Sequence, residues 1–315
     1  MPVNVRRILR PLGVALALIV ALLAVRSLVG AWRQAAGTPV QWAFSPGWLA
    51  AALAVAVLTY LVLVESWRRT LHGYGQSASF RAATRVWILS NFGKYFGSFG
   101  IVAGMAFLAQ GEGLSPPVAV TAAVIMQALS LATGVALSGL LAADALRDLG
   151  PLYSWGAVVI GLLAIGGSAV LHSQRALDRI RAFLPAGTPP IRAASVRSLL
   201  LGLTGNALAW LGYGVVMVLL ARGLFASPPP GLADATSAYT VSYLTGLLAL
   251  FVPAGLGLRE TIFTALLAPA AGLKVAAALA IASRILLTLV ELVIALPFVV
   301  LRRRRAPSST SDPHR

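Results

Sequence analysis

The chain has 315 residues, of which 58% are apolar and 11% charged, and it contains no cysteine. A soluble domain has about 25% charged residues, so this composition excludes a water-soluble enzyme, a disordered chain and a disulfide-rich secreted domain. The mean hydropathy of +0.85 predicts an all-α polytopic membrane protein instead. The net charge of +16 would suit nucleic acid in a soluble protein. Here the basic residues lie between apolar runs, as in cytoplasmic loops, so we expect no nucleic-acid partner.

Six apolar segments are long enough to cross a bilayer, which takes about 20 residues. They are residues 11–31, 48–66, 118–142, 152–171, 199–221 and 275–301. Two further apolar stretches, 86–110 and 236–270, are interrupted by glycine or proline, which break helices. Such backbone is stable at membrane depth only where it is buried in protein or lines a wet cavity. We therefore predict about six full spans and two broken, re-entrant segments.

The basic residues form four clusters that should all face the cytoplasm. The clusters are Arg6, Arg7 and Arg10; Arg68, Arg69, Arg81 and Arg85; Arg175, Arg179, Arg181, Arg192 and Arg197; and Arg302 to Arg305. Eight simple spans cannot place all four on one side, whereas a hairpin at 86–110 that enters and leaves on the cytoplasmic side can. Residues 236–270 would then form a hairpin from the outside or, equally compatible with the charges, two full spans.

The predicted organisation is one transmembrane domain, residues 1–305, followed by a disordered cytoplasmic tail at 306–315. Each half, 1–150 and 151–305, would contain three spans and one broken segment. Because three is odd, the second half is inverted relative to the first, an arrangement typical of secondary transporters. We expect a multi-pass protein of the cytoplasmic membrane with both termini in the cytoplasm.

The second broken segment contains the strongest candidate site. Pro253, Gly255 and Gly257 are expected to unwind the backbone immediately before Arg259 and Glu260. Ionisable groups deep in a membrane cost about 2.5–3.5 kcal/mol each and usually pair or face a cavity, and a helix N-terminus binds anions. The pattern predicts a buried headgroup site; the alternative is a solvated turn at the membrane surface.

In the first broken segment, Lys94 lies among glycines and close to Asn91 and Tyr95. At a hairpin tip it would bind phosphate as a point charge; the alternative is a side chain that extends to the membrane interface. Gly93 and Gly97 have the spacing that permits close backbone approach.

The last span carries Arg284 and Glu291, which share a face because they are seven residues apart. This predicts an intramembrane charge pair, which has either a functional or a purely structural role. Adjacent residues on a helix do not face each other, so Glu260 should find its partner on another segment, with Arg284 the best candidate.

Residues 251–260, Phe-Val-Pro-Ala-Gly-Leu-Gly-Leu-Arg-Glu, resemble the F-V-P-G-G-L-G-x-R-E motif of the lysylphosphatidylglycerol synthase transmembrane-region family, with Ala254 in place of a glycine. Residues 90–95 and Arg284 are similar to other segments of that flippase-like family. The family's first-half acid and arginine have no counterpart at residues 97–100. The resemblance implies movement of phospholipids or polyprenyl-linked lipids between leaflets. The chain ends without the soluble aminoacyl-transfer domain of the bifunctional members, so we do not expect it to make aminoacylated lipid.

We predict a flippase-like lipid transporter and not an enzyme. No nucleotide loop, metal motif or nucleophile motif is present in the sequence, so we expect no cofactor or metal. The expected partners are membrane lipids with anionic headgroups, contacted by Lys94, Arg259 and Arg284, with Glu260 and Glu291 as the partners of these cations. The alternatives are a membrane enzyme or accessory subunit in polyprenyl-linked sugar transfer, and a membrane scaffold.

The topology is testable because the chain has no native cysteine. Single cysteines at Gly111 and Arg181 should be protected from an impermeant maleimide in intact cells, and one at Asp234 should be labelled. Labelling at Gly111 from outside would contradict the cytoplasmic hairpin and, with it, the inverted repeat.

Overall fold

The computed structural model describes residues 40–96, 98–141, 155–156, 159, 162–163, 165–167, 173–181, 195–248, 255 and 257–300. In this part of the chain, four helices are long and apolar enough to cross a membrane: α2 (Pro46–Gly73), α5 (Pro116–Leu141), α9 (Val196–Leu224) and α12 (Leu273–Val300). They confirm four of the six predicted spans. The spans predicted at 11–31 and 152–171 and the tail at 306–315 lie outside the described residues, apart from isolated helical positions within 152–171.

The remaining described helices are shorter. They are α3 (Phe80–Asn91), the 3₁₀ helix η1 (Phe92–Phe96), α4 (Ser98–Gln110), α8 (Gln174–Arg181), α10 (Leu232–Leu248) and α11 (Leu258–Ala271). Local sequence accounts for several of the helix starts. Pro46 begins α2, where its missing N–H is not needed, and the side chains of Ser79 and Ser195 cap α3 and α9 by accepting from backbone N–H groups.

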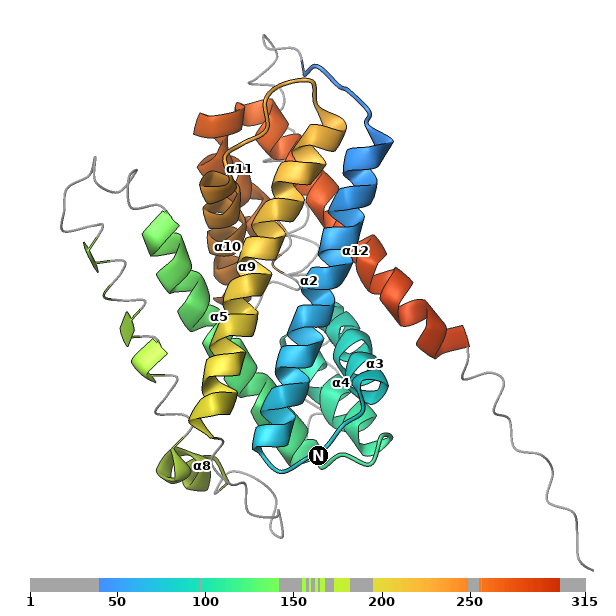
Figure 1. Cartoon of the computed structure of the whole chain (residues 1–315), viewed down its shortest axis with the longest axis vertical. Helices are drawn as coiled ribbons and strands as arrows, with labels where there is room; N and C mark the ends of the chain where they lie inside the picture. The colour runs from blue at the N-terminus through green and yellow to red at the C-terminus, as the bar shows by residue number, and fades with distance from the viewer. Residues whose placement is uncertain are drawn as a thin grey trace, which may run out of the picture.

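Both interrupted stretches form broken hairpins. α3 packs against α4 and α10 against α11; in Figure 1 the first hairpin lies in the lower half of the bundle and the second in the upper half. These four helices have 12, 13, 17 and 14 residues, which makes them about 18–26 Å long. Each is shorter than the hydrocarbon core of about 30 Å. The structure therefore supports a re-entrant hairpin at 236–270 over two full spans.

The two halves of the chain run in opposite directions (Figure 1). α2 descends to the lower end, where the α3–α4 hairpin begins and ends, and α5 then ascends. α9 ascends to the upper end, where the α10–α11 hairpin begins and ends, and α12 then descends. The order helix, broken hairpin, helix thus occurs twice with inverted orientation, as the charge pattern predicts.

Small residues hold the two halves together along α2 and α9, which form the broadest helix contact of the described chain. A Cβ atom on Gly205 would lie 2.0 Å from Oγ of Ser66, and one on Gly212 would lie 2.4 Å from Oγ1 of Thr59. The Ser66 hydroxyl donates a 3.3 Å hydrogen bond to the carbonyl of Leu201. In a membrane, where apolar burial does not drive helix association, such close packing supplies much of the attraction.

The first hairpin turns on a close contact between backbones. The structure brings Gly93 against Gly100: a Cβ atom on Gly93 would lie 2.3 Å from the carbonyl carbon of Gly100. Farther from the tip, the position of a Cβ on Gly104 is 3.4 Å from Cα of Ser90. Gly97, which has the spacing from Gly93 that permits close backbone approach, lies outside the described residues. Gly93 belongs to η1, which turns the chain between α3 and α4, so its contact with Gly100 lies at the tip of the hairpin.

We expect Gly93→Ala to destabilise the protein, because the added methyl group meets main-chain atoms that cannot move aside without separating the hairpin. Overpacking of this kind costs about 1–3 kcal/mol. The measurement is the melting temperature of the purified protein in detergent. Gly47→Ala is the matched control, since nothing lies within 4 Å of its added Cβ. Equal melting temperatures for both variants would contradict the close contact.

Candidate functional site

The five predicted site residues come together around the middle of α12. Glu291 is nine residues from the end of this helix and Arg284 eleven from its start, which corresponds to about 14 and 16 Å. Lys94 belongs to η1 at the tip of the first hairpin, and Arg259 and Glu260 open α11 at the tip of the second. Both broken hairpins therefore deliver charged groups to one span, far from both of its ends.

Glu291 connects α12 to the first hairpin. Its carboxylate accepts from Nζ of Lys94 at 2.6 and 2.7 Å and from the hydroxyl of Tyr60 on α2 at 2.6 Å. Glu291 is 3% exposed. A buried carboxylate with two donors is satisfied only while both remain in place, since the loss of one leaves a poorly compensated charge.

Glu260 connects the second hairpin to α12. One carboxylate oxygen accepts from the Arg284 guanidinium, which confirms the pairing predicted from the sequence. The other oxygen accepts from the backbone N–H of Gly257 at 2.6 Å and caps the start of α11. Gly257 and Gly255 have φ values of 86° and 62°, a region that favours glycine. These glycines unwind the chain so that Glu260 can serve both partners.

The charge pair predicted between Arg284 and Glu291 needs correction. The structure pairs Arg284 with Glu260 and Glu291 with Lys94. The two α12 residues do share a helix face, but seven residues separate them by about 10 Å along the axis. An opposite charge on a hairpin tip is closer to each of them.

Arg259 has a different environment. Its guanidinium carbon lies 4.4 Å from the ring centre of Tyr243 and 5.6 Å from that of Tyr239, within cation–π range. The absence of side chains at Gly246 and Gly255 makes room for its stem, because a Cβ on Gly246 would lie 2.3 Å from Cγ of Arg259. In the part of the chain that the structure describes, no salt bridge joins Arg259 to a carboxylate.

A row of tyrosines joins the two ends of the site. Tyr60 meets Tyr213 of α9 edge-on at 6.2 Å, and Tyr213 stacks on Tyr239 of α10 at 4.8 Å. These three rings, all buried, lead from Glu291 to Arg259. None of the three tyrosines is among the site residues predicted from the sequence. Their positions could have indicated them, because Tyr60 and Tyr213 lie in the middle of spans, whereas tyrosines that anchor a membrane protein lie at span ends.

A small cavity lies between the second hairpin and α12. Arg259, Glu260 and Arg284 line it together with Ser242 and Ser283. It has room for about one water molecule. The conformation described here therefore has a polar centre that is closed to a headgroup.

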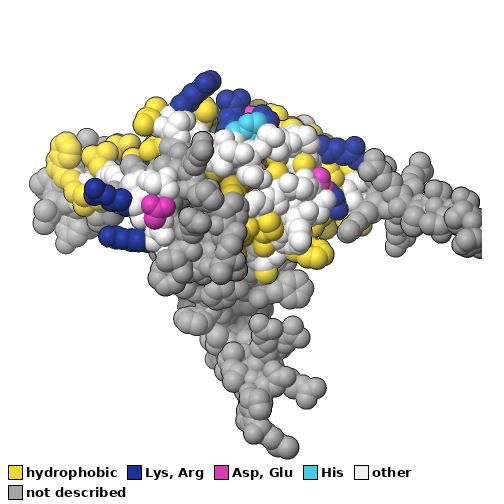
Figure 2. Space-filling view, turned by 90° about the horizontal axis from the view of Figure 1, so that it is seen from below, with side chains coloured by type: hydrophobic (Ala, Val, Ile, Leu, Met, Phe, Trp, Pro, Cys, Tyr) yellow, Lys and Arg dark blue, Asp and Glu magenta, His cyan; other side chains and the backbone are white. Residues whose placement is uncertain are grey.

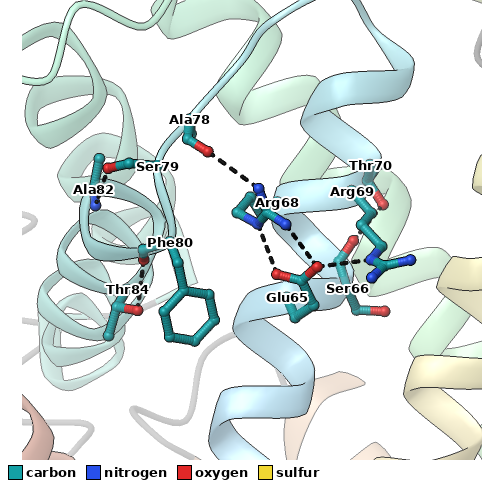
Figure 3. Close-up of polar contacts among 10 residues, drawn as sticks. All are labelled: Glu65, Ser66, Arg68, Arg69, Thr70, Ala78, Ser79, Phe80, Ala82 and Thr84. Atoms are coloured by element: carbon teal, nitrogen blue, oxygen red, sulfur yellow. Dashed lines mark hydrogen bonds and ion pairs between the residues drawn. The ribbon is translucent and has the colours of Figure 1, made fainter.

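A second charged cluster lies at the lower end of α2. Figure 3 shows Glu65 accepting from Arg68 at 2.6 and 2.8 Å and from Arg69 at 2.7 Å. Arg68 also donates to the carbonyl of Ala78 at 3.4 Å, across the connection to α3. The Arg69 side chain is 48% exposed. The cluster lies near the C-terminal end of α2, and exposed ion pairs of this kind contribute little to stability.

The lower end of the bundle as a whole is basic. Figure 2 looks onto this end and shows Lys and Arg side chains spread over it. The exposed residues of its elements include Arg69, Arg81, Arg175, Arg179 and Arg197. The ends of helices at the opposite side carry only Arg222, Asp234 and Lys274 among the described residues. The charge asymmetry of the sequence is thus an asymmetry between the two ends of the bundle.

The apolar helices, the two broken hairpins and the paired charges define a polytopic helical membrane protein with a buried polar centre. The chain belongs to the family described as the lysylphosphatidylglycerol synthase TM region, whose model matches residues 8–295. This match confirms the resemblance seen at 251–260 and establishes a multi-pass membrane protein of a family concerned with lipid-related processes. Comparison with curated proteins gives no match.

The Glu260–Arg284 pair can be tested by a double-mutant cycle on stability. Glu260→Gln and Arg284→Gln should each lower the free energy of unfolding, by up to about 3–5 kcal/mol, because each leaves a buried charge uncompensated. The double variant should lose less than the sum of the two. Arg69→Gln is the exposed control and should change stability by about 1 kcal/mol or less. Additive losses would show that the two side chains do not interact.

Proposed function

We propose that the protein moves a lipid with an anionic headgroup between the leaflets of the cytoplasmic membrane. The observation that carries the proposal is the convergence of Lys94, Arg259 and Arg284 on the centre of a bundle of apolar helices. Charges at such depth are costly and are typical of substrate or ion pathways. An anionic headgroup loses hydration when it leaves water. The cations of the two hairpin tips and of α12 would replace the lost interactions.

The ion pairs suggest how the headgroup would be accepted. A lipid phosphate and a carboxylate bind the same cations, so the phosphate would take the place of Glu291 at Lys94 or of Glu260 at Arg284. The displaced carboxylates retain other donors, the hydroxyl of Tyr60 for Glu291 and the N–H of Gly257 for Glu260. This exchange keeps each buried charge partly compensated while the lipid is bound.

The outer surface suits the rest of the lipid. α12 presents a stripe of exposed apolar side chains, among them Ile281, Ile285, Leu289 and Leu292. The acyl chains would stay in the hydrocarbon along this stripe while the headgroup passes through the polar centre. Because the cavity holds about one water molecule, the tips of the hairpins must separate from α12 for each passage.

The proposed orientation follows from the charges at the two ends. Under the positive-inside rule, the basic lower end would face the cytoplasm. The α3–α4 hairpin would then enter from the cytoplasm and the α10–α11 hairpin from outside. Alternating separation of the two tips from α12 would open the centre to one side at a time, as inverted repeats do in secondary transporters.

Transport is measurable with purified protein in liposomes that contain fluorescent phosphatidylglycerol, by quenching the dye in the outer leaflet. Wild-type protein should expose the inner-leaflet dye to the quencher. Lys94→Gln should slow this exposure about tenfold or more, equivalent to about 1.4 kcal/mol, and the exposed control Arg69→Gln should transport normally.

Rates in this assay are compared per correctly folded molecule, from the monodisperse fraction of each preparation. Wild-type liposomes that behave like protein-free liposomes for every lipid tested would contradict the proposed function. Equal rates for Lys94→Gln and wild type would show that Lys94 does not contribute to transport, while lipid transport itself would still be supported.

A further inference from the structure

We infer that the protein moves a proton together with each lipid, and that Glu291 carries this proton. The inference rests on the proposed function, in which a lipid phosphate takes the place of Glu291 at Lys94, and it names the ion that is coupled to lipid movement. The proton and the lipid would cross in the same direction. With a headgroup of one negative charge, the coupled movement transfers no net charge.

Glu291 loses a cation when Lys94 binds a phosphate. Among the described residues, the carboxylate accepts from the ammonium of Lys94 and from the neutral hydroxyl of Tyr60. Glu291 is 3% exposed, so water does not replace the ammonium while the centre is closed around the lipid. A buried carboxylate without a cation is disfavoured relative to its neutral form. Binding of the phosphate should therefore be accompanied by binding of a proton to Glu291.

The other described ionisable groups near the level of Glu291 are neutral, bound elsewhere or more distant. They are Tyr213 of α9, Arg259 and Glu260 of α11, and Arg284 of α12 itself. Tyr213 lies behind Tyr60, with 6.2 Å between the ring centres. Arg284 is bound by Glu260 and lies about 10 Å from Glu291 along the helix axis. The arginines of α2, α3 and α9 lie toward the ends of the bundle.

Glu260 is better able to remain ionised when its cation leaves. If a phosphate binds Arg284, the backbone N–H of Gly257 still donates to Glu260 at 2.6 Å. Glu260 also lies in the first turn of α11, where the helix dipole and the free N–H groups stabilise a negative charge. Glu291 lies nine residues from the end of α12, too far from a helix terminus for either effect. Of these two carboxylates, Glu291 is therefore the proton carrier.

The proton enters and leaves on the same sides as the lipid. Where the lipid enters, water supplies a proton to a carboxylate oxygen of Glu291, while Lys94 remains an ammonium and binds the phosphate. Where the lipid leaves, Lys94 returns to Glu291, whose carboxyl group releases the proton to water on that side. The exchange involves two side chains and the phosphate, so it holds whatever the net charge of the centre. Membrane-embedded carboxylates carry protons in this way in pumps and transporters.

The test measures how a pH difference distributes acyl-labelled fluorescent phosphatidylglycerol between the leaflets of proteoliposomes. Valinomycin with equal K⁺ on both sides holds the membrane potential at zero, and quenching of the outer dye after equilibration gives the distribution. With the outside one pH unit more acid, wild-type protein should enrich the lipid in the inner leaflet about tenfold, because one pH unit corresponds to about 1.4 kcal/mol per proton. Movement of the lipid anion alone gives equal leaflets, and protein-free liposomes are the blank.

Three variants identify the carrier. Glu291→Gln cannot bind the proton and should abolish the enrichment. Glu260→Gln should retain it, because an equilibrium distribution does not depend on the rate at which it is reached. Glu65→Gln is the matched control, since it removes a paired carboxylate that lies outside the centre, and it should retain both the enrichment and the wild-type rate.

The outcomes separate this inference from the proposed function. Wild-type protein that moves the lipid without enrichment would overturn the inference while lipid transport stands. Enrichment by Glu291→Gln, or its loss in Glu260→Gln, would overturn the assignment of the proton to Glu291. If Glu291→Gln moves no lipid, the Glu260→Gln distribution decides that assignment. If wild-type protein moves no lipid at any pH, the proposed function fails and the inference fails with it.

Discussion

The pairing of charges along α12 is the constraint on which the centre of this structure depends. α12 offers an anion, Glu291, to the first hairpin and a cation, Arg284, to the second, and each tip brings the opposite charge. In a low-dielectric interior these groups cannot remain single without a large desolvation penalty. Both broken hairpins, which are too short to cross the membrane, are therefore held against the same span.

The polar attachments of the hairpin tips differ in kind from the packing elsewhere in the bundle. Close packing at glycines, such as Gly93 against Gly100 and Gly205 against Ser66, holds the first hairpin and the α2–α9 pair together. The attachments of the hairpin tips to α12 are polar: Lys94 with Glu291 and Glu260 with Arg284. Under the proposed function, these ion pairs are the contacts that a lipid phosphate would replace, whereas the close packing would stay in place.

Much of the architecture follows from the sequence because it depends on local quantities. Apolar runs of sufficient length predicted α2, α5, α9 and α12, and glycine and proline within two other runs predicted the breaks. The positions of basic clusters predicted the inverted order of the halves. One tertiary contact, between Glu260 and Arg284, was also predicted from the sequence. A buried carboxylate needs a cation, and Glu260 cannot pair with the adjacent Arg259 because adjacent residues on a helix do not face each other.

The sequence by itself determined the class of protein, the four long spans of the described chain, the positions of the two breaks and the charged residues that must be buried. Only the tertiary structure decided the partners: Lys94 with Glu291, Tyr60 as a second donor to that carboxylate, and Arg259 on two tyrosine rings. The physical reason is the distance along the chain over which each interaction acts. Hydropathy and helix breaking act within one segment, whereas a salt bridge, a ring contact or a hydrogen bond such as the one between Tyr60 and Glu291, 231 positions apart, depends on how separate helices pack.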